Sequence, residues 1–168
     1  ALGTGTGTML TGTVITNSTL GFSNNVNYTA AERVTISGTG ASGEGAIANY
    51  SGANTFLGAI VLGQNSSIGT MAGQLLLGGA ITNGGFFLTV TNAPSTILTI
   101  TNRVSGTGGL IHDGTGTLVL AGTNTFSGAT TNNNGMLLVA TNFALGTVGG
   151  STVVNSGATH GFSNNVIY

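Results

Sequence analysis

Glycine, threonine or asparagine interrupts every stretch of this chain that would be long enough for a helix, and 31 of the 168 residues are glycine. A glycine inside a helix costs about 1 kcal/mol relative to alanine, so helices are disfavoured from end to end. What remains is a series of short segments in which apolar and polar residues alternate, such as Phe87–Thr91, Leu98–Thr101 and Thr117–Leu120. This period of two predicts short, half-buried strands joined by tight turns.

The sequence also repeats itself. The stretch GFSNNVNY at Gly21–Tyr28 returns as GFSNNVIY at Gly161–Tyr168, an offset of 140 residues (161 − 21). Ala1–Thr4 returns as Ala144–Thr147, at an offset of 143 residues (144 − 1). We interpret residues 1–168 as a single segment that holds about one 140-residue repeat unit and the start of the next.

A shorter echo lies inside this unit. GANTFLGA at Gly52–Ala59 matches GTNTFSGA at Gly122–Ala129, at half the longer offset. Repeated short strands and turns without helices are typical of a parallel β-solenoid, in which each coil buries an apolar inner face against its neighbours. Coils of roughly 18–25 residues predict about eight turns, each rising about 4.8 Å. The alternative is an antiparallel β-sandwich, which also uses short strands.

The alternation selects the residues expected to point inward. We expect the interior to be formed by Val14, Leu20, Phe22, Val34, Ile36, Ile47, Phe56, Ile60, Leu62, Leu75, Leu77, Ile81, Leu88, Val90, Leu98, Ile100, Leu118, Leu120, Phe126, Leu137 and Val139.

Charge is nearly absent. Only 3% of the residues are charged, against about 25% in an average protein, and the net charge is −1. Such a chain has almost no basic residue to neutralise a phosphate, which argues against nucleic acid and anionic lipid as partners. Low charge also removes repulsion between copies and favours association.

Cysteine is absent as well, so disulfides and thiolate metal sites are excluded. No apolar run approaches the roughly 20 residues of a membrane helix, so we expect no membrane insertion by this segment. The sequence carries neither an initiator methionine nor a recognisable signal segment, and it is interpreted as a mature or excised piece.

One stretch carries a family resemblance. Gly106–Ala140 contains a Gly-Gly-Leu strand, a Gly-Thr-Leu-x-Leu strand, a Gly-x-Asn-Thr-Phe-x-Gly turn and a Gly-x-Leu strand. This order resembles the autotransporter-associated β-strand repeat of long bacterial surface proteins, although that family usually has lysine at the position of His112. The resemblance implies a right-handed parallel β-helix in the passenger region of a protein on the bacterial cell surface.

Candidate catalytic residues are few. The only carboxylates are Glu32, Glu44 and Asp113, and they are expected to be exposed and separate, although a Glu32/Glu44 pair across a coil stays open. His112 and His160 are interpreted as unrelated surface histidines rather than as metal ligands. We therefore predict no catalytic residue, no metal site and no cofactor.

Several other motifs resemble functional sites only weakly. One aspartate cannot serve a calcium-binding repeat, which needs an aspartate in each turn. The glycine-rich runs Gly3–Thr8 and Gly38–Gly45 lack lysine and are interpreted as turns rather than phosphate loops. Thr-x-Thr pairs lack a constant spacing, so ice binding is a distant alternative. The Asn-x-Ser/Thr triplets are expected in a chain of this composition.

Together these features predict a structural protein and not an enzyme. The chain is expected to form a rigid extracellular or cell-surface fibre by end-to-end continuation of β-helical coils, with itself as partner. Neither end shows a charge cluster, a proline block or an amphipathic helix, so we expect uncapped ends that recruit further coils. A stalk in an autotransporter-like adhesin is the alternative.

Overall fold

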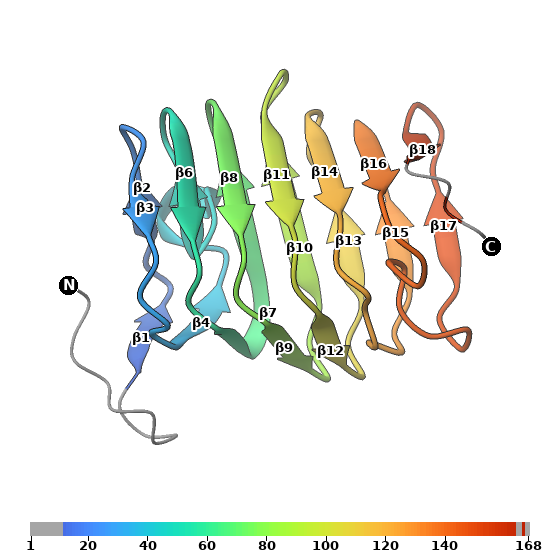
Figure 1. Ribbon diagram of the computed structural model, residues 1–168, viewed down its shortest axis with the longest axis horizontal. Helices are drawn as coiled ribbons and strands as arrows, with labels where there is room; N and C mark the ends of the chain where they lie inside the picture. Colours follow the sequence, from blue (N-terminus) through green and yellow to red (C-terminus); the bar gives the residue numbers. More distant parts are fainter. Residues whose placement is uncertain (1–11, 164–165, 167–168) are drawn as a thin grey trace.

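The chain folds into a right-handed parallel β-solenoid of about seven turns (Figure 1). The computed structural model describes residues 12–163 and 166. Every strand pairing is parallel, which excludes the antiparallel sandwich. The only helical element within the described residues is a single 3₁₀ turn, η1 at Ala41–Gly43. The predicted fold class is therefore confirmed.

One side of the coil is a seven-stranded sheet to which each turn contributes one strand, seen in front in Figure 1. Its strands succeed one another along the solenoid axis without any change of order. At about 4.8 Å per strand, the described rod is roughly 34 Å long. The strands are β3 (Asn27–Tyr28), β6 (Ala53–Phe56), β8 (Gln74–Leu77), β11 (Ile97–Ile100), β14 (Thr117–Leu120), β16 (Met136–Val139) and β18 (Thr159–Phe162).

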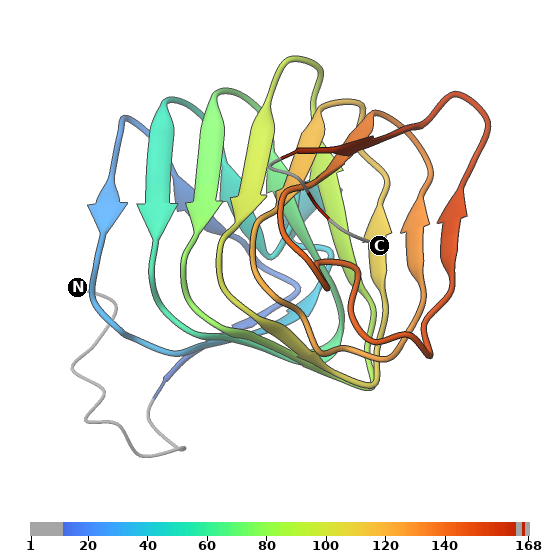
Figure 2. The same cartoon turned by 45° about the vertical axis from the view of Figure 1, so that its right-hand side comes forward.

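An eleven-stranded sheet forms the other two sides of the coil, and Figure 2 shows the chain bending between them. The long strand β7 (Ile60–Thr70) runs along both sides and joins them. On the first side it continues a stack of β1 (Thr13–Thr16), β4 (Val34–Gly38), β9 (Ile81–Gly84) and β12 (Val104–Gly106). On the second side it belongs with β2 (Leu20–Phe22), β5 (Ile47–Asn49), β10 (Leu88–Asn92), β13 (Leu110–His112), β15 (Thr130–Asn132) and β17 (Thr152–Val154).

The core is a set of apolar ladders inside the coil. The predicted inward residues are buried, with two exceptions. Val14 is 69% exposed, and its neighbour Ile15 is buried instead. In a strand a shift of one residue moves a side chain to the opposite face, and the pairing of Ile15 with Ile36 decides which residue points inward. Leu20 is half-buried and packs against the core.

The coils differ in length more than predicted. Leu118 pairs with Leu137, 19 positions later, whereas Asn27 pairs with Thr55, 28 positions later. The second of these coils contains the 3₁₀ turn η1, which adds residues without adding a strand of its own. This is one reason why the chain makes about seven turns rather than eight.

Glycines at the corners allow neighbouring coils to approach closely. Gly73 has φ of 73°, and a Cβ atom there would collide with the backbone of Gly52 in the preceding coil. Gly135 has φ of 59°, and a Cβ atom would meet the carbonyl oxygens of Gly114 and Gly116. Both corners precede a strand of the seven-stranded sheet, so glycine at these points keeps its strands in register.

The two copies of the repeated phrase occupy different sides of the coil. Gly21 and Phe22 lie in β2, which pairs with β5 in the eleven-stranded sheet. Gly161 and Phe162 lie in β18, which pairs with β16 in the seven-stranded sheet. Tyr28 and Phe162 lie on the same side of the coil, six turns apart, and are separated by 134 positions (162 − 28). The repeat offset of 140 residues is longer than these six turns, so the two copies do not fall at equivalent positions. Half of the second copy, together with Ala1–Thr4, lies outside the described residues.

Candidate functional site

The three carboxylates do not form a cluster of titratable groups. Glu32 is buried, contrary to the prediction, and its two oxygens accept hydrogen bonds from the Thr13 hydroxyl at 2.8 Å and the Tyr28 hydroxyl at 2.6 Å. Glu44 lies on the η1 loop, where it accepts a hydrogen bond from Tyr50 at 2.7 Å. That bond raises the pKa of the Tyr50 hydroxyl. Each glutamate is thus held by its own tyrosine.

Glu32 is best explained as a structural residue of the first turns. It lies between β3 and β4 and fastens Thr13 of β1 to the coil that follows. Sequence reasoning missed the burial of Glu32 because the adjacent opposite charges of Glu32 and Arg33 indicate a neutral pair on the surface. The nearby tyrosine, four positions earlier, is the signal that could have indicated a partner.

His112 is fully buried, so its assignment to the surface was wrong. It lies at the end of β13, between Asn92 of β10 and Asn132 of β15 on the adjacent coils. Its Nδ1 atom is 2.9 Å from Asn132 Oδ1, and its Nε2 atom is 3.2 Å from Asn92 Oδ1. The three side chains form a polar ladder inside the solenoid, which we call the Asn-His-Asn ladder.

The amide nitrogens orient the two asparagines of the Asn-His-Asn ladder. Asn92 donates to the carbonyl oxygen of Thr117, and Asn132 donates to that of Thr159, both at 2.8 Å. Both Oδ1 atoms therefore face the imidazole. A neutral imidazole has one N–H and donates to only one of them. This arrangement ties four successive coils together and leaves no free face on the ring for a ligand.

Burial lowers the pKa of His112, and the hydrogen bond to Asn132 and the negative charge of Asp113 oppose that shift. Burial likewise lowers the pKa of His160, whose ring lies 5.0 Å from that of Phe162. The two histidines are on different sheets, β13 and β18. No group of three or more histidine or acidic side chains suited to a metal ion occurs among the described residues.

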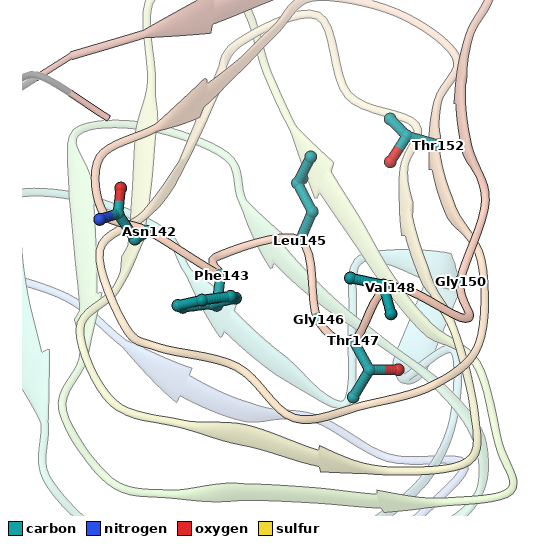
Figure 3. Close-up of a pocket in the computed structure, with 8 residues that line it drawn as sticks. All are labelled: Asn142, Phe143, Leu145, Gly146, Thr147, Val148, Gly150 and Thr152. Carbon is teal, nitrogen blue, oxygen red and sulfur yellow. The ribbon is translucent and has the colours of Figure 1, made fainter. Parts of the chain in front are cut away.

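The last described coil borders a hollow. Figure 3 shows Phe143, Leu145 and Val148 along the segment between β16 and β17 that borders it. The hollow is about 630 Å³ and is mainly apolar. Phe143 is 65% exposed and Val148 is fully exposed, whereas Leu145 packs partly against the core. The lining carries no charged residue and hence no group for acid–base chemistry.

Two sheet edges lie at this end of the solenoid, and Thr152 of β17 lines the hollow. β17 pairs only with β15, and β18 pairs only with β16, so within the described part of the chain each has one strand neighbour. The N–H of Asn155 donates back to Asn132, and that of Ser163 back to Val139. Because N–H groups alternate in direction along a parallel strand, those of Val154 and Phe162 point toward the next position on the axis. The most distinctive feature of this end is a backbone edge, not a reactive centre.

Comparisons with protein-family models, curated proteins and solved structures found no match to this chain. The resemblance of residues 106–140 to the autotransporter-associated repeat therefore stays a prediction from sequence. None of the described residues forms a helix long and apolar enough to cross a membrane.

Proposed function

We propose that this chain is a structural segment of a rigid extracellular rod, extended by the addition of further β-helical coils at its ends. The observation that carries the proposal is the pair of edges at β17 and β18. They offer the same parallel pairing that every interior coil uses on both of its sides. An added coil would satisfy these N–H and C=O groups and cover the apolar hollow next to them.

The repeated phrase does not carry this proposal, because its two copies lie on different sides of the coil. The support comes from geometry and from charge. A net charge of −1 over 168 residues offers little repulsion between coils placed end to end. A head-to-tail contact that does not close on itself produces a filament rather than a ring.

A bacterial surface setting is part of the proposal. It is supported by the resemblance of Gly106–Ala140 to a repeat found in bacterial surface proteins. A rod of this kind needs no catalytic residue, metal or cofactor. The separation of Glu32, Glu44 and Asp113 is consistent with that.

The test is the concentration dependence of particle length. We expect electron microscopy and light scattering to show rods that lengthen as concentration rises. Val154→Pro removes one outward N–H at the β17 edge and should leave short particles, while Val153→Thr, in the same strand, should not. Circular dichroism checks that both variants remain folded.

A tandem chain of two copies separates rod formation from adhesion by a stalk. A continuous solenoid would double the rod length of roughly 34 Å. Wild-type particles of constant length up to millimolar concentration, together with a tandem chain that behaves as two separate bodies, would refute the rod.

A further inference from the structure

The outer surface of the seven-stranded sheet is a regular, uncharged face. Its register is unbroken from β6 to β18, whereas the eleven-stranded sheet shifts register between Ser105 and Gly106 and between Ile36 and Gly38. Side chains alternate between the core and the outside, so two ladders of residues point outward. They are Thr55, Leu76, Thr99, Val119, Leu138 and Gly161, and beside them Ala53, Gln74, Ile97, Thr117, Met136 and Thr159.

Aliphatic side chains gather in the middle of this face. Leu76, Ile97, Val119, Met136 and Leu138 lie on the four neighbouring strands β8, β11, β14 and β16. Leu76, Ile97, Val119 and Leu138 are half-buried, and Met136 is 39% exposed. A contiguous apolar patch on a monomer commonly marks a site of association. We call these five residues the aliphatic patch.

On the neighbouring side of the coil, the ends of the strands carry polar side chains. At the ends of β13, β15 and β17, the outward residues are Asp113, Asn133 and Asn155, and Asn155 donates a hydrogen bond to Asn133 at 2.7 Å. The charged residues Glu32, Arg33, Glu44, Arg103 and Asp113 all lie outside the strands of both sheets. None of them therefore belongs to the aliphatic patch.

We propose that two copies of this chain pack side by side through the aliphatic patch, one seven-stranded sheet against the other. The face has no aromatic side chain on which a sugar ring could stack and no cation to hold a phosphate. A second copy offers an equally uncharged surface with the same spacing of strands, so side chains of the two sheets stay in step along the axis. Packed sheets of this kind lie about 10 Å apart.

One ladder of the face runs through Thr55, Leu76, Thr99, Val119 and Leu138, in that order. Thr99 lies between the aliphatic side chains of Leu76 and Val119. In a two-fold arrangement the same patch meets itself, and residues near the axis lie opposite their own copies. Thr99 is central in the ladder and is expected near this axis.

The size of the face indicates how strong the contact is. Six strands about 4.8 Å apart and two to three outward positions per strand outline a surface on the order of 500 Å². A standard interface buries about 800 Å² on each partner, so two single chains should associate weakly. In a rod of many units the same contact repeats along the axis, and the pairing becomes strong through multivalency.

Lateral pairing differs from the axial extension proposed above, because it uses side chains on the outside of the sheet rather than backbone at its edges. The experiment is therefore done in a Val154→Pro background, which removes an outward N–H from the axial edge. Sedimentation equilibrium from 10 µM to 1 mM should show a monomer–dimer equilibrium. Val119→Lys should weaken dimerisation at least tenfold, whereas Ile111→Lys, an outward residue on β13, should leave it unchanged.

A cross-linking experiment keeps the proposal testable if the lysine variants do not fold. The chain has no cysteine, so Thr99→Cys introduces a single thiol at the centre of the face. Mild oxidation should give a disulfide-linked dimer for Thr99→Cys and little for Thr131→Cys, an outward position on β15. A sample that stays monomeric to 1 mM, or equal cross-linking of the two cysteine variants, would overturn the lateral contact.

Discussion

The inner surfaces of the two sheets stack different kinds of side chains from coil to coil. In the seven-stranded sheet Leu98, Leu118 and Leu137 stack directly on one another from coil to coil. In the eleven-stranded sheet, Val90 is followed at the same position by His112 and then by Asn132. All six side chains are completely buried.

The difference shows that the backbone ladder of a solenoid accepts either kind of interior. An apolar ladder is stabilised by burial alone and requires no orientation of its members. A polar ladder is tolerated only where each polar atom finds a partner, as the asparagine amides do by reaching carbonyl oxygens on the next coil. The leucine ladder should therefore tolerate shape changes poorly, and the Asn-His-Asn ladder should tolerate loss of single partners poorly.

The largest effect is expected from a cavity in the leucine ladder. Leu118→Ala removes a fully buried side chain between Leu98 and Leu137 and should lower the free energy of unfolding by about 2–5 kcal/mol. Val119→Ala, one residue on and facing outward, is the matched control and should cost less than about 1 kcal/mol. Urea unfolding measures both. Equal losses would mean that the ladder is no more critical than the surface.

The Asn-His-Asn ladder should respond to single and combined substitutions in opposite ways. Asn132→Ala removes the partner of His112 Nδ1 and the amide that donates to the carbonyl oxygen of Thr159, and should cost about 1–3 kcal/mol. Replacing Asn92, His112 and Asn132 together by leucine removes most of the ladder's polar atoms and should recover part of that loss. Comparing the unfolding midpoints of the two variants tests this. A triple variant less stable than Asn132→Ala would show that the polar ladder contributes more to stability than an apolar ladder at the same positions.

Acidification should weaken the polar side selectively. Burial lowers the pKa values of His112 and His160 below the unfolded value of 6.5, so the unfolded state binds more protons once the pH falls below that value. The contribution of the neutral histidines is present above about pH 6.5 and is lost as the pH falls toward their folded pKa values. Thermal unfolding between pH 8 and pH 5 should show a decreasing midpoint.

The matched variants assign this pH dependence. His112→Gln should flatten the curve between pH 7 and pH 5 more than His160→Gln, because His112 is fully buried and His160 is not. A wild-type midpoint that stays constant over this range, or rises on acidification, would contradict the account of both histidines.

The smallest effect is expected outside the coil, one residue beyond the Asn-His-Asn ladder. Asp113 is exposed, and its contact with Asn134 is 3.4 Å long. Asp113→Asn should change the free energy of unfolding by less than about 0.5 kcal/mol. Chemical denaturation provides the measurement. A hydrolytic activity of the wild type that this variant lost would contradict the structural interpretation of the chain.

Local patterns predicted much of this fold. The segments Thr117–Leu120 and Leu98–Thr101 were expected as strands and correspond to β14 and β11, because strict alternation over four residues is typical of half-buried strands. The burial of Phe56 and Phe126 followed in the same way. The polar interior did not follow, since histidine and asparagine are usually exposed and no local pattern shows which coils will stack them together.

The sequence by itself determined that the chain would be a helix-free stack of short parallel coils with an uncharged surface. Glycine and asparagine recur in the turns between the strands, and alternation selects one apolar side. Only the tertiary structure decided which side of the coil each strand joins. Gly21-Phe22 and Gly161-Phe162 share their letters but lie in different sheets, because the first pair is held by β5 and the second by β16. A strand supplies only one of the two partners in each pairing. The sheet that it joins is therefore decided by the strand of the neighbouring coil with which it pairs.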